Sequence, residues 1–148
     1  MDYLIFSVME DRYAIPVSQV REIVDRKTAL HADSFHPSFI GFVDHREGKV
    51  PVYSLRKRLD YADEEDGDAI VIVDTGSTDR YRFMALLVDE VLEVVSVDLR
   101  RLSDLPGFEK SGARSPCRRI IDGEDALIIV LDATSLVEEE ERKALAAI

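Results

Sequence analysis

The stretches AIPVSQVREIVD at residues 14–25 and ALLVDEVLEVVS at residues 85–96 repeat one pattern, 71 positions apart. Aligned residues are identical at five positions and conservatively replaced at two others. The pairs are Ala14/Ala85, Val17/Val88, Val20/Val91, Glu22/Glu93 and Val24/Val95, then Ile15/Leu86 and Ile23/Val94. A repeat of this kind indicates two similar structural units within one chain.

A second pair of segments supports the repeat. VPVYSLRKRL at residues 50–59 has the same apolar rhythm as IIVLDATSLV at residues 128–137, with an offset of 78. The later copy therefore contains 7 extra residues, which we place in the loop between Leu102 and Pro116. The alternative is chance similarity among Val-rich segments. A true repeat within 148 residues predicts a pseudo-symmetric pair of small β-barrels.

Short apolar segments bounded by turn residues recur along the chain and predict a mainly β structure. The expected strands are Tyr3 to Val8, Tyr13 to Pro16, Ile40 to Asp44, Val50 to Tyr53, Ile70 to Asp74, Phe83 to Asp89, Val91 to Val95 and Ala126 to Leu131. Several runs, such as IVIV at residues 70–73, do not alternate between apolar and polar residues. They indicate strands that are covered on both faces.

Helices are expected at two places only. From Val17 to Asp25, apolar residues recur at a spacing that is typical of one helix face. From Leu136 to Ile148, the chain is rich in charged residues and alanine, which favour helix. The acidic start of this second segment suits the positive end of a helix dipole.

Composition places limits on function. The chain length is typical of a single domain, and the net charge of −11 repels nucleic acid and anionic membranes. Cys117 is the only cysteine, so no internal disulfide can form. The N-terminus lacks a signal-peptide pattern, and no apolar run is long enough to span a membrane. These features predict a cytoplasmic protein that is not inserted in a membrane.

The sequence contains no motif for catalysis, metal binding or cofactor binding. His31, His36 and His45 lie close in sequence, but no zinc-site spacing accompanies them. The glycines form no phosphate-binding loop, and no GxSxG turn is present. The acids at residues 63–66 are typical of a hydrated loop. We therefore predict a non-catalytic protein, without metal or cofactor, that acts by binding other proteins.

The stretch HPSFIGFVDHREGKVPVYSLRKRL, from His36 to Leu59, resembles the signature region of the CheW family. The matching residues are Pro37, Phe39, Ile40, Gly41, Arg46, Val50, Pro51, Val52, Leu55 and Arg56. Segments before and after this region also follow the order of the family, so the resemblance covers nearly the whole chain. It departs from the family pattern at Arg46-Glu47-Gly48, Ser54, Ala85 and Ile121-Asp122.

The resemblance implies a fold that agrees with the repeat. Members of the family form two intertwined five-stranded SH3-like β-barrels with short helices. Residues 1–148 would then form a single CheW-like domain of two pseudo-repeated barrels, with a C-terminal helix at about 136–148. Where this chain lacks a glycine of the family, we expect a local bulge or an altered loop.

The resemblance also implies a function. The chain would be an adaptor that couples the cytoplasmic tip of methyl-accepting chemoreceptors to the regulatory domain of the histidine kinase CheA. The residues that match the receptor-binding groove are Val20, Glu22, Ile23, Arg46, Ile70 and Val94. Val50 and Val52 match the kinase contact. Two alternatives stay open: a divergent CheW-like scaffold of another chemosensory or motility pathway, and an enzyme or small-molecule binder that uses the cleft between the barrels.

Overall fold

The strands form two six-stranded mixed sheets, which we call barrel A and barrel B. The computed structural model describes residues 1–31, 38–46, 48–61, 67–77, 82–104, 117–123 and 125–136. Barrel A contains β1 (Asp2–Val8), β2 (Asp11–Pro16), β9 (Glu90–Ser96), β10 (Leu102–Asp104), β11 (Cys117–Asp122) and β12 (Leu127–Leu131). Barrel B contains β3 (Val20–Asp25), β4 (Ala29–His31), β5 (Phe39–His45), β6 (Gly48–Ser54), β7 (Ala69–Asp74) and β8 (Phe83–Val88). The prediction of two intertwined SH3-like barrels is confirmed, and the three-residue strands β4 and β10 bring each sheet to six strands.

The helical elements of the described residues are short, and all but the last lie between strands. They are α1 (Leu55–Arg58) and the 3₁₀ turns η1 (Val17–Gln19), η2 (Arg26–Thr28), η3 (Leu99–Arg101) and η5 (Ala133–Ser135). Among the described residues, no helix is both long enough and apolar enough to cross a membrane. The C-terminal helix expected at 136–148 lies outside the described residues beyond Leu136.

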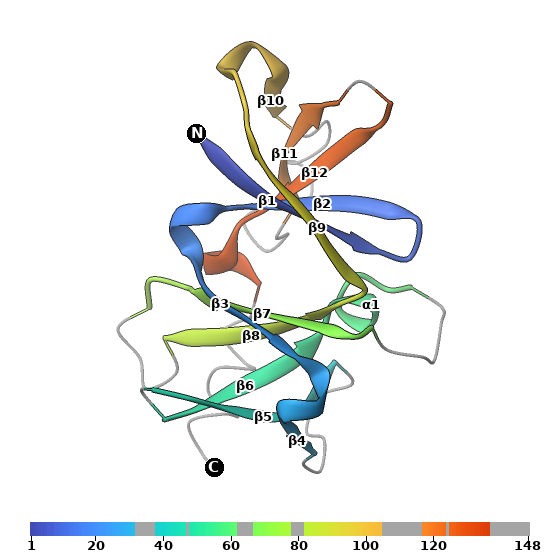
Figure 1. The fold of residues 1–148 in the computed structure, drawn as a ribbon. Helices are drawn as coiled ribbons and strands as arrows, with labels where there is room; N and C mark the ends of the chain where they lie inside the picture. The colour runs from blue at the N-terminus through green and yellow to red at the C-terminus, as the bar shows by residue number, and fades with distance from the viewer. Residues whose placement is uncertain are drawn as a thin grey trace.

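Each barrel is built from both halves of the chain. Strands β1 and β2 join β9 to β12, whereas β7 and β8 join β3 to β6. The sheet orders are β10-β11-β12-β2-β1-β9 and β3-β7-β8-β6-β5-β4. In Figure 1, β3 therefore descends from the upper barrel into the lower one, and β9 rises from the lower barrel into the upper one. We call β3 and β9 the crossing strands.

The two barrels have matching strand registers. The parallel pair β6 and β8 aligns Val52 with Ala85, and the parallel pair β12 and β2 aligns Val130 with Ala14. These residues are related by the offsets of 78 and 71 that the sequence shows. The β5–β6 and β11–β12 ladders also share their register and have a bulge at the same place. The backbone is therefore repeated strand by strand.

The extra residues of the second half are not all in one loop. Ala29 and Leu102 begin β4 and β10 and are 73 positions apart, so two extra residues precede β10. Phe39 and Cys117 begin β5 and β11 and are 78 apart, so the other five lie between β10 and β11. The expected insertion between Leu102 and Pro116 thus accounts for only part of the difference.

The helix predicted from Val17 to Asp25 is wrong. Only η1 is helical there, and Val20–Asp25 is a strand that pairs with β7. Val20 and Val24 are half-buried, but a bulge between Val20 and Glu22 turns them to opposite faces of the strand, so they pack against different core clusters. The sequence does not show the bulge, and the apolar spacing therefore fits a helix face. Pairing with β7 and the β-branched side chains favour the strand.

A central core lies between the barrels, and each barrel has a smaller core of its own. Fully buried residues of the central core come from both barrels, for example Phe6 of β1 and Leu86 of β8. The core of barrel B is formed by Ile40, Val43, Val50, Val52, Ile70, Ile72, Ala85 and Leu87. The core of barrel A is formed by Tyr3, Ile5, Ala14, Val97, Ile121, Ile128 and Val130.

A polar clamp also joins the barrels at the junction of β8 and β9. The Arg56 guanidinium on α1 donates two hydrogen bonds to the Asp89 carboxylate, through Nε and Nη2, both at 2.8 Å. The same carboxylate accepts a hydrogen bond of 2.7 Å from the backbone N–H of Met9, in the β1–β2 turn. Asp89 therefore holds elements of both barrels at the point where the chain passes between them.

We expect replacement of this carboxylate to destabilise the fold. The variant Asp89→Ala removes the two charge-assisted hydrogen bonds of the Arg56 guanidinium, whose side chain is only 13% exposed. The free energy of unfolding should fall by about 2 kcal/mol, as measured by urea denaturation. Asp44→Ala removes the exposed pair with Lys49 and serves as a control with an unchanged midpoint. Equal midpoints for the two variants would contradict the clamp.

Candidate functional site

The crossing strands carry exposed apolar side chains at equivalent positions. Ile23 on β3 is 47% exposed, and Val94 on β9 is 58% exposed. Both strands are sheet edges, and in Figure 1 β9 passes in front of β1 and β2 while β3 passes in front of β7. Val20 is half-buried and packs against the central core. Ile23 and Val94 are thus available to a partner, whereas Val20 supports the strand.

Glu22 lies against His45, the last residue of β5. Its Oε2 lies 3.4 Å from Nε2 of His45, whose side chain is only 11% exposed at the end of β5. Arg46, the next residue, is exposed in the turn. The structure therefore brings Glu22 and the Arg46 turn together on one side of barrel B. In this turn Gly48 has a φ of 117°, so the displaced glycine serves a left-handed conformation that favours glycine.

Three residues predicted to contact partners lie in the core instead. Ile70 and Val52 are fully buried, and Val50 is 3% exposed. All three belong to the core of barrel B, so they cannot touch a partner directly in this structure. Their strands are covered on both faces, and the sequence pattern does not distinguish which apolar residues reach the surface. These three residues therefore support the barrel and do not form part of its surface.

A buried acid next to the crossing strand β3 was not predicted. Asp74, at the end of β7, accepts hydrogen bonds of 2.8 and 2.7 Å from Nε and Nη2 of Arg82 and one of 2.9 Å from Nη2 of Arg21. Its side chain is 8% exposed. The hydrogen bonds from Arg82 are the main reason why the pKa of Asp74 lies far below its ordinary value of 3.8, although burial opposes this shift. This cluster fixes β3 against β7.

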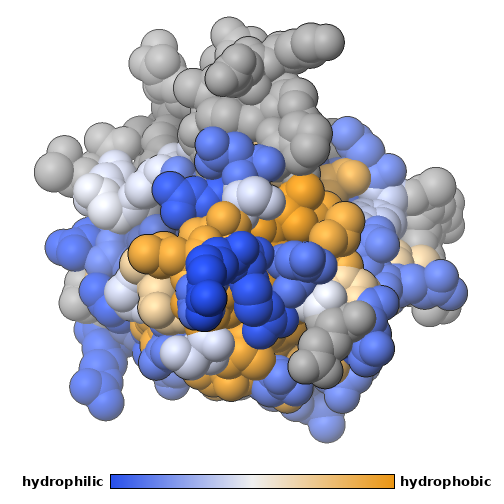
Figure 2. All heavy atoms as spheres, turned by 90° about the horizontal axis from the view of Figure 1, so that it is seen from above, coloured by the Kyte–Doolittle hydropathy of each residue, from blue (hydrophilic) through white to orange (hydrophobic). Residues whose placement is uncertain are grey.

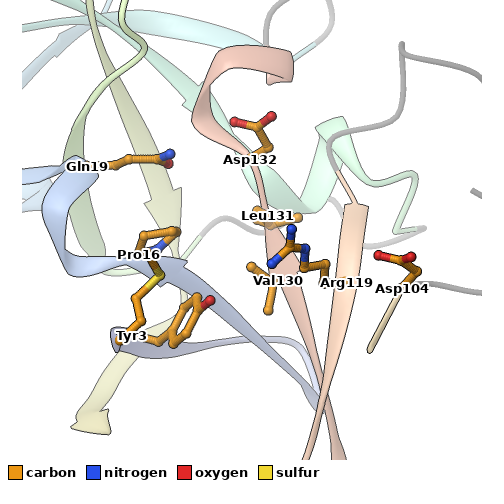
Figure 3. A pocket seen from close by; sticks show the side chains of 9 residues that line it. Tyr3, Pro16, Gln19, Asp104, Arg119, Val130, Leu131 and Asp132 are labelled. Carbon is orange, nitrogen blue, oxygen red and sulfur yellow. The ribbon is translucent and has the colours of Figure 1, made fainter. Parts of the chain in front are cut away.

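A cavity of about 430 Å³ opens beside barrel A, where η1 leaves β2. Figure 3 shows the Arg119 guanidinium between Leu131 and Val130, with Asp104 to one side and Asp132 near η5. Asp132 is engaged with the backbone and hydroxyl of Thr134. Gln19 accepts a hydrogen bond of 3.3 Å from the Ala133 N–H. The described side chains of this cavity contain no nucleophile hydrogen-bonded to a base.

A metal centre is likewise not visible in the part of the chain that the structure describes. No group of three or more His, Cys, Asp or Glu side chains there is arranged to hold an ion. His36 lies outside the described residues, and His45 faces Glu22 and Phe83. The described surface therefore offers exposed apolar edges with flanking charges, which are features of protein recognition.

Fold and surface together define a class: a twin SH3-like β protein with exposed apolar crossing strands. The model of the CheW-like domain family matches residues 2–141, and the chain belongs to this family. The chain is 26% identical over 141 residues to the chemotaxis protein CheW of Bacillus subtilis (strain 168), covering 93% of this chain and 86% of that protein. It is 23% identical over 145 residues to the chemotaxis protein CheW of Rhizobium meliloti (strain 1021), covering 97% and 91%.

A solved structure supports the fold. The crystal structure of the scaffolding protein TtCheW from Thermoanaerobacter tengcongensis superposes with a TM-score of 0.79. The match covers 95% of each chain at 23% sequence identity. At this identity, the likeness extends to the paths of the strands and not to individual surface side chains.

The acid dependence of stability tests the Asp74 cluster. Because the pKa of Asp74 is lower in the folded than in the unfolded chain, its stabilisation is complete at neutral pH. It is lost as the pH falls below 3.8 toward the folded-state value. Asp74→Asn should lower the free energy of unfolding at neutral pH by about 2 kcal/mol and flatten its decline in acid. Urea titrations across this pH range measure both effects.

The matched control is Asp44→Asn. Asp44 is 78% exposed and lies 3.6 Å from Lys49, so its replacement should leave the acid slope of the parent protein. An Asp74→Asn variant with the same acid slope as the parent would contradict the shifted pKa.

Proposed function

We propose that this chain is a non-catalytic adaptor that couples chemoreceptors to the histidine kinase CheA in chemotaxis. Membership of the CheW-like family is the observation that carries the proposal. The two crossing strands add support, because each presents an exposed apolar residue at the same position of the repeat. A role in such a complex places the protein in the cytoplasm.

The receptor-binding surface that we propose combines the crossing strands with the turn at residues 46–48, which we call the signature turn. Ile23 and Val94 supply apolar contacts, and Glu22 and Arg46 supply charges that fix the register of a partner helix. Val20, the first residue of β3, packs against the central core and holds the strand in place. The chemoreceptor tip is helical, and a helix with an apolar stripe between polar residues matches this mixture of side chains.

For the kinase regulatory domain we propose contact at a barrel end. Val50 and Val52 are buried, so their exposed strand neighbours replace them in this proposal. Lys49, next to Val50 on β6, has a side chain that is 59% exposed and lies 3.6 Å from Asp44 of β5, on the strands of barrel B and not in the turn that carries Arg46. Barrel-end contact leaves the faces of the crossing strands accessible to a receptor.

Placing a charge on the crossing strands should weaken receptor binding. Ile23→Asp and Val94→Asp each bury an unpaired carboxylate against an apolar helix face, and we expect a loss in affinity of at least about tenfold. Calorimetry with a receptor tip fragment measures this loss. Leu127→Asp is the matched control, because Leu127 is 60% exposed on β12, a strand that pairs with β11 and β2 and with neither crossing strand. Equal effects of all three substitutions would contradict the surface.

The signature turn is tested by Arg46→Ala. This exposed side chain makes no ion pair with any described residue, so its removal should leave the fold intact. We expect weaker receptor binding and unchanged binding of the kinase regulatory domain, both measured by calorimetry. A parent protein that binds the kinase domain but no receptor would favour a scaffold of another pathway. Turnover of a substrate by the purified protein would favour the enzyme alternative.

A further inference from the structure

The two barrels differ at the turns of two equivalent hairpins, β5–β6 in barrel B and β11–β12 in barrel A. In barrel B, the ring of His45 closes this end beside Phe83, with 5.7 Å between the ring centroids, and contacts Glu22. The offset of 78 relates His45 and Gly48 of barrel B to Gly123 and Ala126 of barrel A. His45 pairs with Gly48 across its hairpin, and Gly123 hydrogen-bonds to Ala126 across the equivalent one. A ring in barrel B therefore corresponds to a glycine in barrel A.

The residues that contact the His45 ring in barrel B are only partly kept at the equivalent positions of barrel A. The offset of 71 relates Phe83 to Arg12 and Glu22 to Glu93, so the carboxylate is kept while the aromatic ring becomes a guanidinium. A cavity of about 260 Å³ lies at this end of barrel A. It is lined by Arg12, Glu93, Val95, Val97, Arg101, Ile121, Gly123, Asp125, Ala126 and Ile128.

The chain cannot place its own ring at residue 123 without a local shift. A Cβ atom added to Gly123 would lie 2.6 Å from the backbone oxygen of Ala126, which is closer than such atoms approach. The hairpin of barrel A thus excludes a side chain where barrel B has an imidazole. A ring in this space therefore cannot belong to residue 123.

The cavity offers an apolar floor and unused polar groups. Ile121 and Ile128 are 1% and 9% exposed and form part of the core below. Arg101 donates from Nε to the Asp122 carbonyl at 2.9 Å. By contrast, the Arg12 guanidinium and the Glu93 carboxylate make no hydrogen bond or ion pair with any described residue. Figure 2 looks down on this end of the molecule and shows a hydrophobic patch crossed by hydrophilic side chains.

We propose that this cavity binds a small planar nitrogen heterocycle with a ring N–H. The ring N–H donates to the Glu93 carboxylate, as the His45 imidazole lies against Glu22 in barrel B. One face of the ring stacks on the Arg12 guanidinium, which is planar and packs well on aromatic rings. The ring edge rests on Ile128 and on the half-buried Val95 beside it. The site does not depend on the proposed adaptor function.

The probe is imidazole, because the side chain of His45 places this ring at the equivalent position of barrel B. At about pH 8.5 free imidazole is neutral and carries one ring N–H, whereas neutral 1-methylimidazole carries none. Titration of the full chain, followed by amide chemical shifts, should show saturable changes at Gly123, Ala126 and Ile128. A ligand of this size should bind with a Kd of about 1–10 mM, and 1-methylimidazole at least about tenfold more weakly.

Two variants locate the site. Glu93→Ala removes the acceptor and should weaken imidazole binding at least about tenfold, while the amide spectrum confirms that the fold is kept. Glu90→Ala is the matched control, since Glu90 is exposed on the same strand and does not line the cavity. Three outcomes overturn the proposal: no saturable change at the hairpin, equal binding of 1-methylimidazole, or undiminished imidazole binding by Glu93→Ala.

Discussion

The exchange of β3 and β9 between the two sheets is the constraint on which the rest of the structure depends. Neither half of the chain can complete a sheet alone, because each barrel needs the first two strands of one half and the last four of the other. The central core therefore forms only when both halves are present. The exchange also makes both crossing strands sheet edges, and this is why Ile23 and Val94 remain exposed while their sheets are otherwise well covered.

The repeated backbone carries side chains that have diverged. Barrel B holds β3 with the ion pairs of Asp74, whereas the equivalent positions in barrel A include Ser7 and Leu92. The Arg56–Asp89 clamp likewise joins the barrels at one junction, and the other junction has the weaker contact between Gln19 and Ala133. Matching registers give both barrels the same framework, and the unmatched polar groups give each barrel different surface chemistry.

The sequence predicts most of this framework and less of the site. Strands made of apolar runs, and the repeat itself, can be read directly, because burial on both faces requires such runs. Strand β11 was not predicted, because its segment, Cys117–Asp122, contains two arginines and an aspartate and so has no apolar run. The run at residues 70–73 already indicated that Ile70 is buried, and only the family resemblance assigned this residue to the receptor groove. Arg82 is eight residues from Asp74 in the same hairpin, but Arg21 and both partners of Asp89 are more than 30 residues away, and only the fold brings these together.

Simultaneous binding tests the adaptor account most directly, since a coupling protein must hold both partners at once. Sedimentation of the full chain mixed with a CheA regulatory domain and a chemoreceptor tip fragment measures this. The account predicts a single faster species that contains all three proteins, because the proposed receptor surface lies on the crossing strands and the kinase contact lies at a barrel end. Two separate binary complexes that compete for the chain, or binding of neither partner, would contradict it.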